Sequence, residues 1–144
     1  EKANPTIAVA WRLANALGVS IGELLTPETR PAESIRLLEA HELPTLSSDH
    51  AGYVLRILGP MELAGKFEWY ELTLAPDGVL ASTPHDPGAT EHLTVLQGAV
   101  ELEAGGEKKR IRAGATARYA VDCNHAIRNS GKVEAKALLV VIHR

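Results

Sequence analysis

The chain has 144 residues, of which 45% are hydrophobic and 23% are charged, and its formal net charge is -3. This is the balance of a folded globular protein, and a chain of this length can stabilise a domain without a metal or a disulfide. The slightly acidic charge and the aromatic content of 4% argue against a non-specific phosphate-binding surface and against a base-stacking platform.

Three features of the sequence concern its cellular compartment. The single cysteine, Cys123, has no partner for an internal disulfide, which favours a reducing compartment. The longest apolar run, Ala137–Ile142, is too short to span a bilayer, and Glu1–Lys2 has no signal-peptide character. We therefore expect a cytoplasmic protein with no membrane partner. Because the first residue is not Met, we also expect further sequence before it.

The first 25 residues have the pattern of two short helices. Pro5 suits a first helical position, apolar residues follow at the helical period as far as Leu17, and Gly18 ends the pattern. A capping box at Ser20–Glu23 begins a second helix that ends by Leu25. Two helices of this size cannot bury their apolar residues alone, so they need a partner.

The pattern changes twice after these helices. Residues 26–50 are rich in proline and small polar residues, which predicts a linker with a short strand at Ile35–Leu38. Beyond this linker the hydrophobic period becomes two, and short runs alternate with turn signals. The predicted strands are Tyr53–Leu58, Phe67–Leu74, His92–Leu96, Ala99–Glu103, Lys108–Ile111, Ala115–Tyr119 and Ala135–Ile142. We predict a mainly β fold, an antiparallel double-sheet β-barrel over residues 51–144 that the two short helices precede.

Two stretches of the β region resemble the motifs of the cupin family, whose members are small double-sheet barrels of the jelly-roll type. The matching residues are His85, Glu91 and Gly98 in the first motif and Gly114, His125 and Asn129 in the second. Pro87 stands where the family has its second histidine, and this is a departure from the pattern.

The cupin resemblance implies that Glu91 faces the barrel interior, together with His85 and His125. Two imidazoles and a carboxylate suit a divalent transition metal with open coordination positions, because an inward carboxylate is costly to bury unless it is paired or ligated. The alternative is a pocket without metal, in which Glu91 pairs with a protonated histidine or an arginine. Pro87 cannot bind a metal, so the pocket without metal is the preferred interpretation.

Two residues near this site have simpler interpretations. His92 alternates with Glu91, so we predict that it points outward into solvent. Cys123 lies two residues before His125 and is interpreted as a small buried hydrophobic residue, with a thiolate ligand or a redox sensor as the alternatives.

Two further features of the β region concern which way side chains face. Trp69 and Tyr70 stand on opposite faces of one strand, and the sequence leaves open which of them faces the interior. Lys108–Arg110 follows a glycine turn and is predicted to be a solvated face of a hairpin.

The N-terminal segment Glu1–Leu25 resembles the last two helices of an XRE-type (phage-repressor-like) helix-turn-helix domain. The runs Lys2–Thr6 and Leu13–Ser20 are typical of that family just after its DNA-reading helix. This resemblance places the reading helix before the first residue. Residues 1–25 accordingly contain only Lys2 and Arg12 as basic residues.

Together the two resemblances imply a transcriptional regulator. The barrel would sense a small-molecule effector at His85, Glu91 and His125, and the helix-turn-helix domain would bind duplex operator DNA. A homodimer is expected, because helix-turn-helix proteins usually read paired half-sites. The alternatives are a metal-dependent cupin enzyme, such as a dioxygenase or isomerase, that holds its metal with the same three residues, and a plain binding or storage barrel with no DNA role.

Overall fold

The computed structural model describes residues 16–17 and 34–144. The chain divides into two units, Glu1–Leu37 and Leu38–Arg144, and the second contains the predicted barrel. The predicted helices of residues 1–25 lie outside the described residues, apart from Ala16 and Leu17, which are helical. No helix in the described part of the chain is long and apolar enough to cross a membrane.

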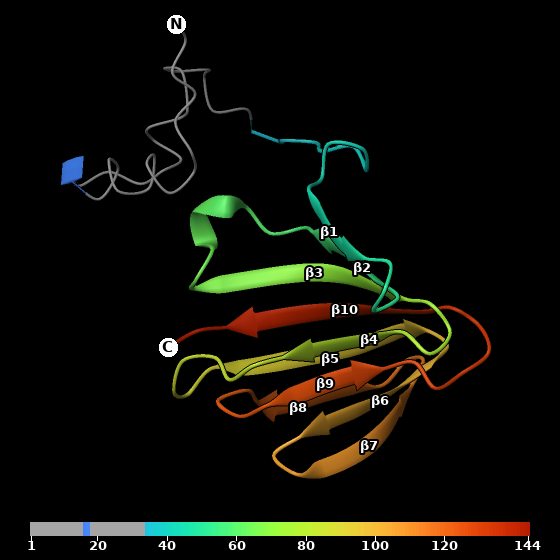
Figure 1. The fold of residues 1–144 in the computed structure, drawn as a ribbon. Helices are drawn as coiled ribbons and strands as arrows, with labels where there is room; N and C mark the ends of the chain where they lie inside the picture. The colour runs from blue at the N-terminus through green and yellow to red at the C-terminus, as the bar shows by residue number, and fades with distance from the viewer. Residues whose placement is uncertain (1–15, 18–33) are drawn as a thin grey trace, which may run out of the picture. The chain divides into compact units, whose positions relative to one another are not determined.

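The second unit is built from antiparallel strands (Figure 1). In chain order its elements are β1 (Thr45–Ser48), β2 (Tyr53–Ile57), the short 3-10 helix η1 (Met61–Leu63), β3 (Phe67–Leu74), β4 (Val79–Ser82), β5 (Thr90–Gln97), β6 (Ala99–Ala104), β7 (Glu107–Arg112), β8 (Thr116–Ala120), β9 (His125–Arg128) and β10 (Ala135–Ile142). The larger sheet has the order β1-β2-β3-β10-β5-β8, and the smaller sheet has the order β4-β9-β6-β7. The predicted double-sheet β fold is confirmed.

The prediction of the strands was incomplete in three places. The strands β4 and β9 were not predicted, because four residues are too few to show an alternating pattern. The short strand predicted at Ile35–Leu38 is wrong: these residues are exposed and not in a strand. The strand of this region is β1, which comes later in the sequence than the predicted strand. A tight turn at residues 49–52 connects β1 to β2 and lets the two strands pair.

The core lies between the two sheets and takes side chains from both. Its largest fully buried members include Leu72, Leu93 and Val95 of the larger sheet and Val100 and Ile127 of the smaller one. Alternate residues of a strand point to the same face. A residue that lies two or four positions along its strand from one of these buried residues therefore points into the interior as well.

Asn129, which directly follows β9, joins the β9–β10 loop to the end of β3 and the turn that follows it. Its side chain is buried, and Nδ2 donates to the carbonyls of Leu74, Ala75 and Val133 at 3.0, 3.1 and 2.8 Å. Its Oδ1 accepts the N–H of Gly131 at 2.9 Å. This residue of the second cupin-like motif therefore has a structural role.

Gly78 occupies the turn between β3 and β4, where two backbone segments come very close together. A Cβ atom at this position would lie 2.3 Å from the carbonyl oxygen of Gly52 and 2.9 Å from that of Ala75. Only a residue without a side chain fits there.

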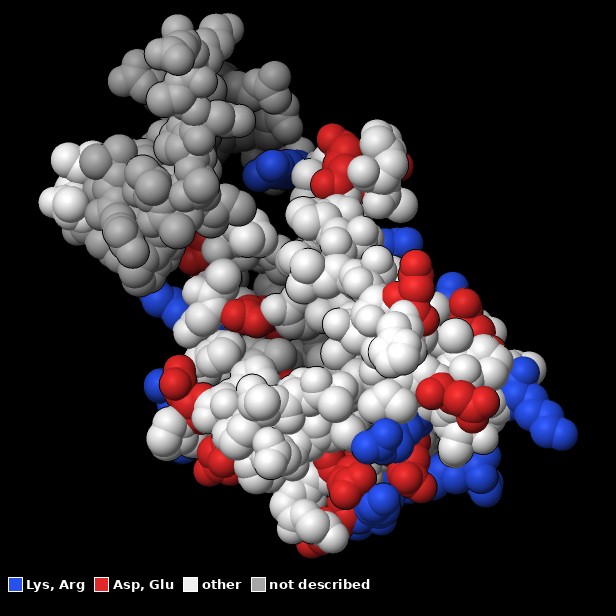
Figure 2. Space-filling model, viewed as in Figure 1, with Lys and Arg blue, Asp and Glu red and all other residues white. Residues whose placement is uncertain are grey.

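The edge strand β7 of the smaller sheet is strongly charged. Lys108–Arg110 is exposed, as predicted, and Nζ of Lys108 lies 3.2 Å from Oε2 of Glu103 on the neighbouring strand β6. Figure 2 shows basic and acidic side chains intermixed at the lower end of the molecule, where Figure 1 places β6 and β7. On the face drawn, this region is a mixed-charge surface rather than the uniformly basic patch that phosphate binding favours.

Candidate functional site

The structure brings the three predicted site residues together inside the barrel. Glu91 on β5 is in phase with the buried Leu93, so it points inward and is only 3% exposed. His125 begins β9 and is buried, and His85 precedes β5 in the loop after β4 and is one-quarter exposed. One potential ligand atom of each residue lies within 4.8 Å of the other two. We call these residues the His–Glu–His cluster.

The carboxylate of Glu91 is the centre of this cluster. Its Oε1 lies 3.3 Å from Nε2 of His125 and 3.8 Å from Nε2 of His85. Its Oε2 accepts the hydroxyl hydrogen of Tyr119 at 2.6 Å. Burial, followed by the negative charge of Glu91, raises the pKa of Tyr119, so the hydroxyl stays protonated and remains a donor.

His125 is fixed through one of its ring nitrogens. Nδ1 lies 2.9 Å from the carbonyl oxygen of Cys123 and donates to it, so Nε2 faces Glu91. This buried Nε2 lies 3.3 Å from Oε1 of Glu91 without the alignment of a hydrogen bond, and it has no other polar partner among the described residues. Burial by itself lowers the pKa of His125, but the Glu91 carboxylate and the Cys123 carbonyl outweigh it and raise the pKa.

The cluster has the donor set of a divalent transition-metal site. A buried imidazole nitrogen without a partner lies beside a buried carboxylate oxygen, and a second imidazole completes the set. Nitrogen and oxygen donors of this kind suit zinc, iron and similar ions. Three protein ligands would leave one or more coordination positions of such an ion open for a small molecule. The same groups also fit a protonated His125 paired with Glu91 in a pocket without metal, since either cation offsets the cost of burying the carboxylate.

A second polar group lies on the same inner face, and sequence reasoning missed it. Val141 of β10 pairs with Glu68 of β3 on one side and with Glu91 of β5 on the other, so both carboxylates point into the barrel. Oε1 of Glu68 lies 3.4 Å from Nε2 of His143, and its other oxygen accepts a hydrogen bond from Tyr70.

Alternation along the strand Phe67–Leu74 puts Glu68 and Tyr70 on one face, a signal that the sequence prediction did not use. The strand register, which pairs β3 with β10 and β10 with β5, was needed to show that this is the face of Glu91. The strand register was also needed for Tyr119, because its pairing with Glu91 between β8 and β5 puts it on the same face as that carboxylate.

Two hollows are lined by His85 or by Tyr119, the residue that donates a hydrogen bond to Glu91. A cleft of about 750 Å³ between the edge strands β7 and β8 is lined by interior residues such as Leu102, Ile111 and Tyr119. A depression of about 610 Å³ is lined by His85 and His143. Of the three cluster residues, His85 is the one that lines either of these hollows.

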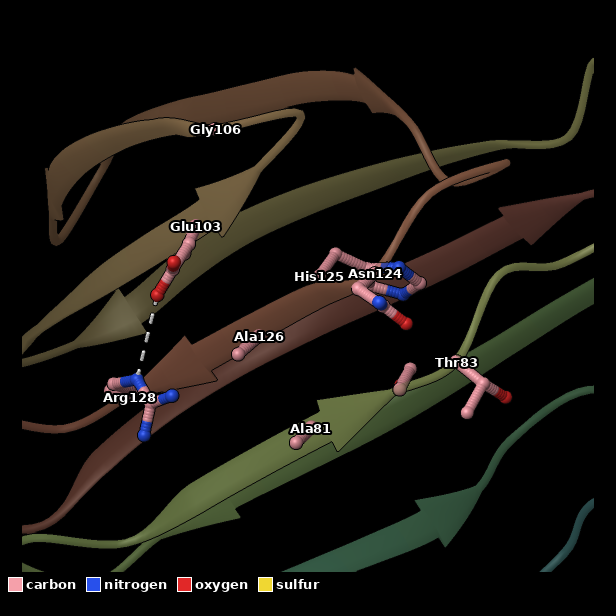
Figure 3. Close-up of a pocket in the computed structure, with 9 residues that line it drawn as sticks. Ala81, Thr83, Glu103, Gly106, Asn124, His125, Ala126 and Arg128 are labelled. Carbon is pink, nitrogen blue, oxygen red and sulfur yellow. Dashed lines mark ion pairs between the residues drawn. The ribbon is translucent and has the colours of Figure 1, made fainter.

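A separate groove of about 530 Å³ lies on the outer face of the smaller sheet (Figure 3). Ala81 and Ala126 are among its lining residues, and Arg128 lies 3.9 Å from Glu103 at one side. Of the His–Glu–His cluster, only His125 lines this groove. The carboxylate that distinguishes the interior site is absent from its lining, so the candidate site is the barrel interior.

The structure also decides the remaining predictions near the site. His92 is on the outer face, as predicted, where it pairs with Arg118 and is half-buried. Tyr70 is the strand residue that faces the interior, and Trp69 faces outward. Cys123 was predicted to be buried, but it is a partly exposed free thiol, because it lies in the loop before β9 and lines the cleft between β7 and β8.

Known proteins share this architecture. The family model described as "Cupin domain" matches residues 70–141. The HTH-type transcriptional regulator SutR of Escherichia coli (strain K12) is 27% identical over 132 residues, which are 92% of this chain and 68% of that protein. The crystal structure of the Cupin_2 domain of an XRE family transcriptional regulator from Enterobacter cloacae is 30% identical, with a TM-score of 0.61, and the match covers 65% of this chain and 98% of that one.

The fold is also found in an enzyme. A sugar phosphate isomerase from a cupin superfamily, from Silicibacter pomeroyi, is 24% identical, with a TM-score of 0.53, and the match covers 65% of this chain and 60% of that one. This likeness concerns the fold alone.

Proposed function

The chain belongs to the cupin domain family, and on this premise we propose that it is part of a transcriptional regulator whose barrel binds a small-molecule effector at the His–Glu–His cluster. The observation that carries the proposal is the buried carboxylate of Glu91 beside two imidazoles, of which that of His85 lines a depression at the surface. The likeness to SutR and to the Enterobacter cloacae regulator supports the regulatory role.

The cluster has the chemistry of a ligand-binding site. A buried carboxylate is costly unless a cation or hydrogen-bond donors satisfy it. A metal ion held by His85, Glu91 and His125 would act as a Lewis acid and would bind an effector through its open positions. Without metal, the hydroxyl of Tyr119 and a protonated imidazole of His125 would satisfy the carboxylate, and an effector would form hydrogen bonds with the same groups.

Binding in the barrel would regulate DNA binding through a change of equilibrium. The effector can shift the protein between two arrangements only by as much as its affinities for them differ. We expect a homodimer in the cytoplasm that binds a two-fold symmetric operator, because paired half-sites require a two-fold axis.

The DNA-binding part of the proposal is tested with a gel shift. A chain extended upstream to include a complete helix-turn-helix domain is expected to select palindromic DNA from genomic fragments. The 144-residue chain alone is expected not to bind it. Tight binding of duplex DNA by the 144-residue chain, or no selection of DNA by the longer one, would contradict the proposal.

The effector part is tested by thermal unfolding of the wild-type chain and of Glu91→Gln in the presence of small molecules and divalent metals. A ligand present at about 100 times its Kd stabilises a protein by about 2.7 kcal/mol. We expect effectors to stabilise the wild type but not Glu91→Gln, and to change operator binding by the longer protein. Turnover of a ligand with stoichiometric metal would instead support the enzyme alternative.

A further inference from the structure

His143 extends the row of imidazoles beyond the His–Glu–His cluster. The ring centroids of His143 and His85 are 5.9 Å apart, and those of His85 and His125 are 5.3 Å apart. Three imidazoles thus follow one another inside the barrel. The two outer ones each lie beside a carboxylate, His125 beside Glu91 and His143 beside Glu68.

The backbone directs the His143 side chain toward the site. Its N–H donates to the carbonyl of Lys66 at 2.9 Å, which continues the pairing of β10 with β3 beyond the last strand residue. Position 143 is two residues after the buried Val141, so its side chain is on the inner face. This side chain is 15% exposed and lines the same depression as His85.

Glu68 orients the imidazole of His143. Oε1 of Glu68 lies 3.4 Å from Nε2 of His143, and the carboxylate is itself held by the hydroxyl of Tyr70 and by the N–H of Gly65. In a metal-binding histidine, the ring nitrogen that does not bind the metal usually donates its N–H to a carboxylate or a carbonyl, and this hydrogen bond fixes the orientation of the ring. Since Nε2 faces Glu68, Nδ1 is the nitrogen of His143 that can bind a ligand.

We propose that His143 is a further metal-binding residue of this pocket, which supplies the next imidazole to a divalent transition-metal ion at the His–Glu–His cluster, and that Glu68 is its positioning residue. The loop that carries His85 provides a single imidazole, because Pro87 has no donor atom. A further imidazole would come from a different element, and the end of β10 brings one beside His85. Among the described residues, only His85, Glu91 and His125 have ligand atoms within 4.8 Å of one another, so the His143 ring has to turn toward the cluster to bind the ion. The inference rests on the proposed function, because it concerns ligand binding at the same cluster.

The experiment is a Co²⁺ titration of the 144-residue chain, followed by calorimetry and by the visible d–d absorption, which reports the number and type of ligands. We expect the wild type to bind one ion. His143→Ala is expected to bind it at least tenfold more weakly, with altered absorption, and Glu68→Gln about tenfold more weakly. His143→Phe keeps a flat ring beside His85 but has no nitrogen, so it is expected to bind as weakly as His143→Ala.

His92→Ala is the matched control, because the His92 side chain is on the outer face of β5, opposite to that of Glu91. It is expected to keep the wild-type affinity and absorption. Circular dichroism of each variant checks that the barrel is folded.

Three outcomes would overturn the inference. One is wild-type affinity and absorption in His143→Ala. Another is wild-type affinity in His143→Phe, which would mean that His143 acts by packing. The third is no Co²⁺ binding by the wild type. If Glu91→Gln loses binding while His143→Ala keeps it, the cluster stands and only the role of His143 fails. The proposed function fails in a different experiment, the gel shift, if no ligand changes operator binding. The Co²⁺ titration measures metal binding alone, so the two failures can be told apart.

Discussion

Replacement of the buried Asn129 by Ala is expected to destabilise the barrel strongly. The amide has two hydrogens to donate, and its three carbonyl acceptors lie at 2.8–3.1 Å, while Oδ1 accepts one further hydrogen bond. The substitution therefore removes about three hydrogen bonds. At about 1 kcal/mol each they give a loss of about 3 kcal/mol.

The assay is urea unfolding of the 144-residue chain, followed by the far-ultraviolet circular dichroism of its strands. With a slope of about 1.5 kcal/mol per M, a loss of about 3 kcal/mol lowers the midpoint by about 2 M and leaves the slope unchanged. Asn124→Ala is the matched control. Asn124 is exposed and makes no side-chain hydrogen bond within the described residues, so its replacement is expected to change stability by less than about 0.5 kcal/mol.

Asn129→Asp separates the hydrogen-bond argument from simple loss of volume. It keeps the shape of the side chain but replaces the donor with a carboxylate oxygen that faces three carbonyls. We expect Asn129→Asp to be less stable than Asn129→Ala at neutral pH, because an unpaired buried charge costs more than a missing amide. A loss below about 1 kcal/mol in Asn129→Ala, or wild-type stability of Asn129→Asp, would refute the reasoning.

Three other substitutions test other parts of the structure. Gly78→Ala is expected to cost about 1–3 kcal/mol, seen as a lower Tm, since the added Cβ would overlap a backbone carbonyl at 2.3 Å. Tyr119→Phe removes a hydrogen bond to the buried Glu91 and is expected to cost about 1.5–3 kcal/mol in urea unfolding, and an unchanged midpoint would argue against that bond. In metal-free protein the pKa of His125 is raised above 6.5 by folding, so its stabilising contribution is complete below pH 6.5 and is lost as the pH rises through the folded value. The stability difference between the wild type and His125→Gln should therefore decrease as the pH rises from about 6 to about 9, and a difference that grows would contradict this.

Much of the fold could be predicted because long strands show their period. Phe67–Leu74 and Ala135–Ile142 have the predicted bounds, since each has eight residues and turn signals outside it. The four-residue strands β4 and β9 were missed because pairing with their neighbours stabilises them, and that pairing is not local in sequence. The apolar run Ile35–Leu38 misled the prediction, because a run forms a strand only when another strand lies beside it.

The candidate site could be predicted only as far as its motifs extend. His85, Glu91 and His125 are in matching motifs, and the structure brings them together. Glu68 and His143 are in no motif, and they reach the site because β10 lies between β3 and β5 in the larger sheet. Strand order is a property of the whole chain, which local spacing does not contain.

The charged edge strand β7 bears on how two copies of this chain can associate. An uncovered edge strand is a template on which a second protein can continue the sheet, and lysine and arginine side chains along it hinder such continuation. Lys108 and Arg110 lie on one face of this edge strand and Lys109 on the other, so two such edges placed side by side would bring like charges together. Growth into extended β-polymers through this edge is therefore discouraged.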